Sequence, residues 1–121
     1  MKQGIVLFAH GSRDPLWHRP MEAIAKQISA WAPERIVLCA YLEISKPDLS
    51  TAFHALKLAS VQSVTVVPMF LGVGKHARED LPILVEDLRR HYADMQIVLA
   101  PPVSEDPRLI EMLATIAMTT Y

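Results

Sequence analysis

The chain has 121 residues, of which 51% are hydrophobic and 21% charged, and its formal net charge is -1. This composition is typical of one packed domain over residues 1–121 and excludes a disordered or fibrous protein. The near-zero charge argues against a nucleic-acid-binding protein, because such domains carry a strong basic excess. The apolar run before His10 is too short for a signal peptide or a membrane span, so we expect a cytoplasmic protein that contacts neither nucleic acid nor membrane. Cys39 is the single cysteine, which excludes an internal disulfide.

Four apolar runs alternate with segments of helical periodicity. The runs 4–8, 35–41, 64–71 and 96–100 predict buried strands. Apolar spacing predicts helices from about Pro20 to Trp31, from a start at Ser45–Asp48, from about Ala77 to Tyr92, and from Asp106–Pro107 onward. In the last helix we expect one inward face, made by Ile110, Leu113, Ala114 and Ala117. Strict alternation predicts an α/β fold, a four-stranded parallel sheet with helices on both faces, similar to half of a flavodoxin-like domain.

A short turn, Ala9–Asp14, follows the first predicted strand. It places His10 at the carboxyl end of that strand, the edge of an open parallel sheet where ligands bind. Gly11 allows a sharp turn or a close approach of the backbone to a ligand. Ser12 or Asp14 can cap the next helix, whose free N–H groups would attract an anion. The turn therefore predicts a metal-capable imidazole beside an anion site.

Two further candidate residues follow other strands. Glu43 comes after the second strand and His76 after the third, so the topology gathers both with His10 at one edge of the sheet. Imidazoles with a carboxylate suit Co, Ni, Fe or Zn and also accept protons near neutral pH. The spacings of a permanent zinc site are absent from the sequence, so a metal in transit is at least as plausible as a fixed cofactor.

Charged and apolar residues surround these candidates in the sequence. Arg13, Lys75 and Arg78 are placed to hold the carboxylates of an acidic ligand. The run from Met69 to Leu71, which includes Phe70, can supply an apolar wall. Simpler interpretations remain open: a turn histidine at His10 and solvated charges at the three basic positions.

The other candidates have structural interpretations as well. His76 can be a surface residue at a helix start, and Glu43 can cap the nearby helix or pair with Lys46. Ser12 is better suited to a cap or an anion ligand than to a nucleophile, because the pattern Gly-x-Ser-x-Gly is absent. We expect structural roles for the remaining histidines, which are His18, His54 and His91.

Three segments resemble the class II tetrapyrrole chelatases, the group that includes sirohydrochlorin cobaltochelatase, sirohydrochlorin ferrochelatase and nickel-inserting relatives. The segments are Phe-Ala-His-Gly-Ser-Arg-Asp-Pro at 8–15, Tyr-Leu-Glu at 41–43, and Val-Pro-Met-Phe-Leu-Gly-Val-Gly-Lys-His-Ala-Arg-Glu-Asp-Leu-Pro at 67–82. The resemblance covers nearly the whole chain in order and spacing. It implies ATP-independent insertion of Co²⁺, Fe²⁺ or Ni²⁺ into sirohydrochlorin or a close tetrapyrrole, in biosynthesis of the cobalamin or siroheme type.

The resemblance also implies roles for residues. The histidines that match His10 and His76 bind the incoming metal and help to take the pyrrole protons, and Glu43 is a third candidate. Gly11, Ser12, Arg13, Lys75, Arg78 and Phe70 are the expected contacts of the tetrapyrrole. No permanent cofactor is implied, since the metal is a substrate.

Short members of the family pair as homodimers, which is therefore the expected assembly. Two other functions stay open at this point: a carrier of metal or tetrapyrrole without turnover, and a small hydrolase that uses Ser12 with His10 or His76 as its base.

Overall fold

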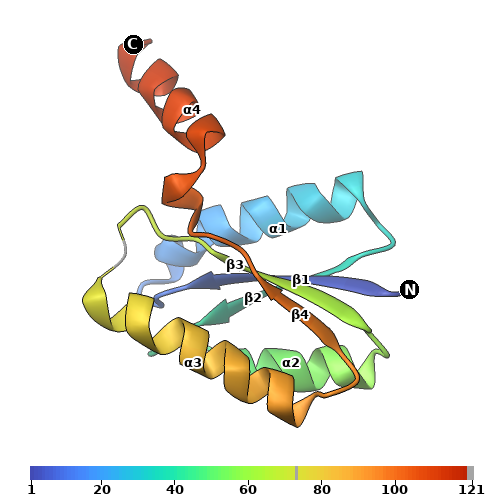
Figure 1. Ribbon diagram of the computed structural model, residues 1–121. Coiled ribbons are helices and arrows are strands. Elements are labelled where there is room, and N and C mark those ends of the chain that lie inside the picture. The colour runs from blue at the N-terminus through green and yellow to red at the C-terminus, as the bar shows by residue number, and fades with distance from the viewer. Residues whose placement is uncertain (73, 120–121) are drawn as a thin grey trace.

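The computed structural model describes residues 1–72 and 74–119, apart from the side chain of His76. Strands and helices alternate along the chain (Figure 1). The strands are β1 (Gln3–Ala9), β2 (Ile36–Tyr41), β3 (Ser63–Pro68) and β4 (Gln96–Leu99). The helices are α1 (Arg19–Trp31), α2 (Leu49–Leu58), α3 (Lys75–His91) and α4 (Pro107–Met118), with short 3-10 helices η1 (Pro15–His18) and η2 (Val103–Glu105).

The four strands form one parallel sheet in the order β2-β1-β3-β4. Phe8 of β1 lies between Ala40 of β2 and Pro68 of β3, so the central strands end nearly level with one another. The predicted fold class is confirmed. Because all strands run the same way, the loops that follow them meet at one edge of the sheet.

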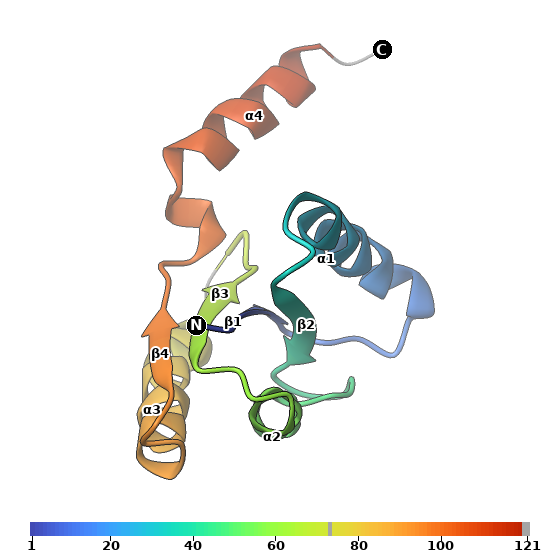
Figure 2. The same cartoon turned by 90° about the vertical axis from the view of Figure 1, so that its right-hand side faces the viewer.

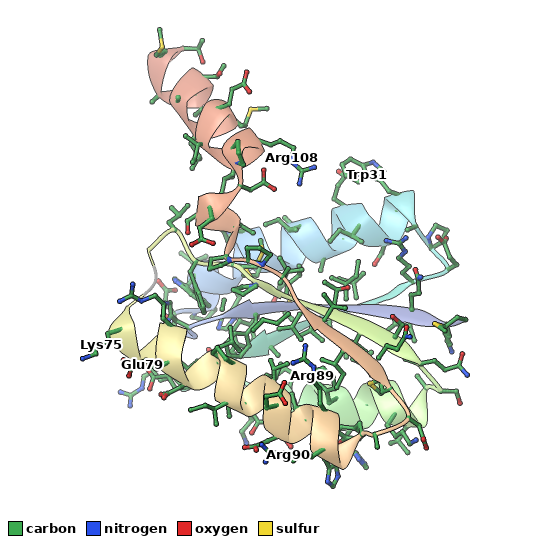
Figure 3. The ribbon with its side chains drawn as sticks, viewed as in Figure 1. Trp31, Lys75, Glu79, Arg89, Arg90 and Arg108 are labelled. Carbon is green, nitrogen blue, oxygen red and sulfur yellow. The ribbon has the colours of Figure 1, made fainter. Side chains whose placement is uncertain are left out.

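Helices cover both faces of this sheet, α1 on one face and α2 with α3 on the other (Figures 1 and 2). The larger core lies under α2 and α3, where Phe8 and Val66 pack with Phe53 and Val85, all nearly inaccessible to solvent. A smaller core lies under α1 and contains Leu7, Ala9, Met21 and Tyr41. Arg89 of α3 donates from Nε and a terminal nitrogen to the carbonyl of Ile97, which fixes α3 against β4 (Figure 3).

The predicted packing of the last helix is wrong. In Figures 1 and 2, α4 stands away from the sheet, and none of its described residues is buried. Ile110 and Leu113, which we expected to face inward, are 57% and 41% exposed. The apolar spacing that predicted an inward face therefore marks a surface that this chain leaves open to solvent.

The structure agrees with one predicted helix start and moves another. Helix α1 begins at Arg19, close to the predicted start at about Pro20, and the 3-10 helix η1 precedes it. The N-cap of α2 is Asp48 and not Ser45, because the Asp48 carboxylate accepts from the amide of Thr51 at 2.8 Å. No helix of the described chain is both long and apolar enough to cross a membrane.

Candidate active site

The loops after β1 and β2 continue the pairing of their strands. The amide of Leu42 donates to the carbonyl of Ala9 at 2.9 Å, and the amide of Glu43 donates to the carbonyl of His10 at 3.1 Å. His10 and Glu43 are thus neighbours across two strands, as the topology predicted. Both are exposed, so both side chains can reach a ligand at this edge.

Gly11 is the residue that permits this close approach. Its φ is +108°, a conformation that L side chains rarely adopt. A Cβ at this position would lie 1.9 Å from the carbonyl oxygen of Glu43. A glycine is required here because the loops after β1 and β2 touch at this residue. Gly11 therefore lies beneath the candidate site.

Ser45 joins the same two loops through its hydroxyl. Its Oγ accepts from the amide of Ser12 at 2.8 Å and donates to the Ser12 carbonyl at 2.8 Å. His18 Nε2 lies 3.3 Å from this Oγ and 3.2 Å from the Ser12 carbonyl. Sequence reasoning missed Ser45 in this role, since nothing in its spacing reveals a partner 33 residues away.

The predicted anion site at the turn is not supported by the backbone contacts. The amide of Ser12 is bonded to Ser45, the amide of Asp14 to Ser12 Oγ, and the amide of Leu16 to the Asp14 carboxylate. These N–H groups have partners within the chain, so they are not free to bind an anion. Ser12 Oγ accepts from Asp14, and His18 contacts the Ser12 carbonyl, an arrangement that does not resemble a serine nucleophile beside its base.

The ring of His10 lies against Phe70. The ring centroids are 4.4 Å apart with an interplanar angle of 34°, and Phe70 in turn packs edge-on against Phe8 at 6.0 Å. Phe70 is only 2% exposed. It therefore lies beneath His10 as a support and offers a ligand little of the open apolar wall that we expected, while Leu71 is 71% exposed.

An aromatic cluster flanks the loops on the α1 side. His18 packs edge-on against Tyr41 at 4.9 Å and against Trp17 at 5.3 Å. Burial, together with the nearby Cys39 thiol, raises the pKa of Tyr41 to about 12. Burial likewise raises the pKa of the Cys39 thiol. Neither group is suited to accept a proton at neutral pH.

The three predicted basic residues are exposed at this end of the molecule. Arg13 lies in the turn after β1. Lys75, which is labelled in Figure 3, and Arg78 lie in the first turn of α3, where no acidic residue is present. Two cations at the positive end of a helix cost free energy in isolation and favour an anionic ligand. A hollow of about 550 Å³, lined by residues 42–48 and Thr51, opens beside Glu43.

The assignment of His10 and His76 as metal ligands stays a prediction. Among the described side chains, no three His, Cys, Asp or Glu residues gather closely enough to hold a metal ion. The backbone of His76 is in the first turn of α3, but its side chain lies outside the described part of the structure. His10 is thus the histidine whose position at the sheet edge is established.

Comparison with known proteins identifies the family. The CbiX family model matches residues 4–118. The chain belongs to the CbiX family. The predicted membership of this chelatase group is confirmed, and the crystal structure of a CbiX protein of cobalamin (vitamin B12) biosynthesis from Marinobacter aquaeolei VT8 has the same fold. That structure is 33% identical, with a TM-score of 0.83 over 96% of this chain and 94% of that one.

Other CbiX relatives have named activities. Sirohydrochlorin cobaltochelatase of Saccharolobus solfataricus is 29% identical over 98% of this chain and 95% of its own length. The cobaltochelatase of Methanopyrus kandleri is 28% identical over 90% of each chain. The sirohydrochlorin chelatase SirB of Bacillus subtilis subspecies spizizenii, solved with cobalt, shares the fold with a TM-score of 0.81 at 24% identity. This CbiX chain matches only 50% of the SirB chain.

Proposed function

We propose that this CbiX protein is a sirohydrochlorin chelatase, which inserts a divalent metal ion into sirohydrochlorin or a close tetrapyrrole without ATP. The observation that carries the proposal is the family match over residues 4–118, which includes an exposed His10 at the ligand-binding edge of the sheet. Relatives named sirohydrochlorin cobaltochelatase match nearly the whole chain, which supports sirohydrochlorin as the class of substrate. The metal ion is a substrate in this reaction.

In the proposed reaction His10 and His76 bind the metal ion and present it to one face of the macrocycle. Imidazole nitrogens are suitable ligands for divalent first-row metal ions such as Co²⁺, Fe²⁺ and Ni²⁺. As the pyrrole nitrogens replace the protein ligands, their protons pass to a histidine or to Glu43, whose amide is bonded to His10. Contact with Phe70 keeps the His10 ring oriented while the metal ion passes from the imidazole to the macrocycle.

The acidic rim of the tetrapyrrole needs cationic partners. We assign this role to Arg13, Lys75 and Arg78, which are exposed around the edge that carries His10. Gly11 and Ser12 contribute the shape of the loop, since their backbone is held by contacts to Glu43 and Ser45. Replacement of these basic residues by neutral ones should therefore weaken tetrapyrrole binding more than it weakens metal binding.

A homodimer is the assembly that fits the proposed reaction. One chain has half the length of the SirB chain that shares its fold. The candidate edge of a single domain is open to solvent, and a macrocycle on it would be covered on one side only. Pairing of two identical domains about a two-fold axis would cover the other side.

The test is an anaerobic absorbance assay of metal insertion. Sirohydrochlorin is mixed with Co²⁺, Fe²⁺ or Ni²⁺, and initial rates are compared for the wild type, His10→Ala and a reaction without protein. We expect the wild type to accelerate insertion and His10→Ala to lose about 10²-fold, the usual contribution of a positioned proton acceptor. His54→Ala is the matched control, because His54 is an exposed histidine of α2 and should leave the rate unchanged.

Two outcomes would contradict the proposal. Insertion at the wild-type rate by both His10→Ala and His76→Ala would remove the histidines from the mechanism. A change in the tetrapyrrole spectrum on protein addition, without acceleration by any of the three metals, would identify a carrier that binds stoichiometrically. The same initial rates show which metal ion is inserted fastest. The ligand types do not decide this, because imidazole and carboxylate groups accept all three metals.

A further inference from the structure

Ile44, the residue after Glu43, combines two unfavourable features. Its φ is +68°, in the left-handed region that β-branched residues avoid. Its side chain is 60% exposed and so contributes little to the hydrophobic cores. Glycine or asparagine would adopt this backbone conformation at a lower cost in free energy. Neither the backbone nor the core therefore accounts for an isoleucine at this position.

Ser60, the other non-glycine residue of the described chain with a positive φ, has a structural explanation. Its φ is +62°, and it follows the last turn of α2. Its amide donates to the carbonyl of Lys57 at 3.0 Å. The next amide, that of Val61, donates to the carbonyl of Leu56 at 3.0 Å. These are the bonds of a Schellman motif, a common end of a helix, whereas Ile44 lies between β2 and α2, where no helix ends.

Hydrogen bonds hold Ile44 in its left-handed conformation. The amide of Ser45 donates to the carbonyl of Glu43 at 2.7 Å, which closes a γ-turn around Ile44. A γ-turn with a positive φ at its centre is rare and strained. Ser45 Oγ is bonded to the amide and to the carbonyl of Ser12, both at 2.8 Å, so the turn is anchored to the loop that follows His10. Strained residues of this kind concentrate at sites that bind ligands.

The strained turn lies at the edge of the sheet that carries the candidate active site. The amide of Glu43 donates to the carbonyl of His10 at 3.1 Å. Ile44 and Glu43 line the same hollow of about 550 Å³. The segment between β2 and α2 begins at the same end of the sheet as the turn after β1 (Figure 1). An exposed apolar side chain is therefore held beside the carboxylate and the imidazole of the proposed reaction.

We propose that Ile44 contacts the face of the tetrapyrrole and contributes to its binding. The inference rests on the proposed function and adds an apolar contact to the charged contacts of Arg13, Lys75 and Arg78. Those cations can hold the carboxylates at the rim of the macrocycle, but its rings are largely apolar and need a different partner. An aliphatic side chain that packs on a ring face is removed from water when the ligand binds. Because the γ-turn fixes Ile44 in advance, little loop entropy is lost on binding.

The test compares sirohydrochlorin binding with the stability of the free protein. The dissociation constant is measured anaerobically and without metal, by absorbance titration, for the wild type, Ile44→Asn and Ile44→Gly. Both new residues adopt a positive φ readily, so the urea midpoint of each variant should equal or exceed that of the wild type. Both lose the aliphatic contact, so the dissociation constant should rise about tenfold. A residue that serves only the fold would not weaken binding without also lowering stability.

Ile44→Leu and Ile83→Asn are the matched controls. Ile44→Leu keeps an aliphatic side chain of the same size and should bind sirohydrochlorin as the wild type does. Ile83 is an isoleucine of α3 with the same exposure of 60%, and Ile83→Asn should leave the dissociation constant unchanged. The kcat of Co²⁺ insertion at saturating sirohydrochlorin should match the wild type in all four variants, because a contact made equally in the ground and transition states changes binding alone.

Four results would overturn the role of Ile44. An unchanged dissociation constant in Ile44→Asn would exclude the contact. A lower urea midpoint in both Ile44→Asn and Ile44→Gly would assign the residue to the fold. A lower kcat with an unchanged dissociation constant would mean that Ile44 acts by placing Glu43 and His10. A mass of one chain for Ile44→Asn by light scattering, beside a mass of two for the wild type, would mean that a second copy covers the residue.

The wild type in the same titrations separates this inference from the proposed function. If the wild type binds sirohydrochlorin and inserts Co²⁺, the proposed function holds whatever the Ile44 variants do. If the wild type binds no sirohydrochlorin, both the proposed function and the role of Ile44 are overturned.

Discussion

Gly11 connects the local conformation of one residue to the shape of the candidate site. Its φ of +108° turns the chain directly after His10, and its lack of a side chain lets the Glu43 carbonyl approach. Ser45 then bonds the same loops together through Ser12. The position of His10 thus depends on a backbone contact and on one hydroxyl group.

Replacement of Gly11 by alanine should therefore damage both stability and activity. The backbone conformation alone costs a non-glycine residue about 1–3 kcal/mol. The new Cβ would also overlap the Glu43 carbonyl, so the loops must separate and His10 must move. We expect a lower free energy of unfolding in urea and a large loss in the rate of metal insertion.

Gly72→Ala provides the control for this prediction. A Cβ at Gly72 meets no atom within 4 Å, and the residue lies in the loop before α3. Alanine there should leave the free energy of unfolding nearly unchanged. Equal stability of Gly11→Ala and wild type would show that the loop tolerates a side chain and that the close approach is dispensable.

Sequence reasoning located the residues of the site better than their supports. His10 and Glu43 were predicted to meet because parallel strands end at a common edge, and their backbones are bonded. His18 and Ser45 were missed in their joint contact with Ser12, since that contact depends on the path of two irregular loops. Loop paths follow no periodicity, so the sequence contains no repeated signal for them.

At the scale of elements, Asp48 fixes where α2 begins. Its carboxylate accepts from the Thr51 amide, and this hydrogen bond lowers the pKa of Asp48. A lowered pKa in the folded state means that the stabilisation is present above the unfolded-state pKa of about 3.9. The stabilisation is lost as the pH falls through the folded-state pKa.

Two substitutions of Asp48 separate the cap from its charge. Asp48→Ala should lower the free energy of unfolding at pH 7 by about 1 kcal/mol, the usual cost of a lost N-cap. Asp48→Asn retains a capping oxygen that does not titrate, so its stability should fall less than that of the wild type in acid. Urea unfolding at neutral and acidic pH measures both effects.

The control for this pair is Asp94→Asn, which removes the charge of an exposed carboxylate in the turn after α3. It should preserve the acid dependence of the wild type. If Asp48→Ala is as stable as the wild type at pH 7, the start of α2 is set by packing of Leu49 and Phe53 rather than by its cap.

The elements themselves were largely predictable, and their packing was less so. Buried apolar runs and helical spacing predicted the four strands, the four helices and the parallel direction of the strands, whereas the order β2-β1-β3-β4 comes from the structure. The third strand ends at Pro68, a residue that cannot donate to a neighbouring strand. The exposure of α4 was not predictable, because apolar spacing says that a helix has a packing face and not which surface covers it.

At the scale of the molecule, one chain presents more apolar surface on its α1 side than its own helices cover. Val98 and Trp31 remain exposed there, beside an α4 that buries none of its described residues. Burial of one large aliphatic side chain contributes about 1.5–3 kcal/mol. Burial of such side chains in the proposed homodimer should thus contribute substantially to its stability.

This contribution makes thermal stability depend on protein concentration. When folding and association are linked, mass action raises the melting temperature as the concentration rises. For a pair of chains of this size, average unfolding enthalpies give roughly 3 °C for each tenfold increase. We expect this dependence in the wild type and in the control Ile83→Glu, which changes an exposed residue of α3, measured by calorimetry over the widest accessible range of concentration.

Ile110→Glu/Leu113→Glu should melt at a lower temperature that does not change with concentration, because two added charges oppose burial of this exposed apolar surface in the proposed homodimer. A constant melting temperature in the wild type would mean that the domain unfolds independently of its partner. The double variant would then be expected to melt with the wild type, since the residues it changes are exposed in the single chain. If the melting temperature depends on concentration in the wild type and is constant in the double variant, α4 is the element that links folding to association.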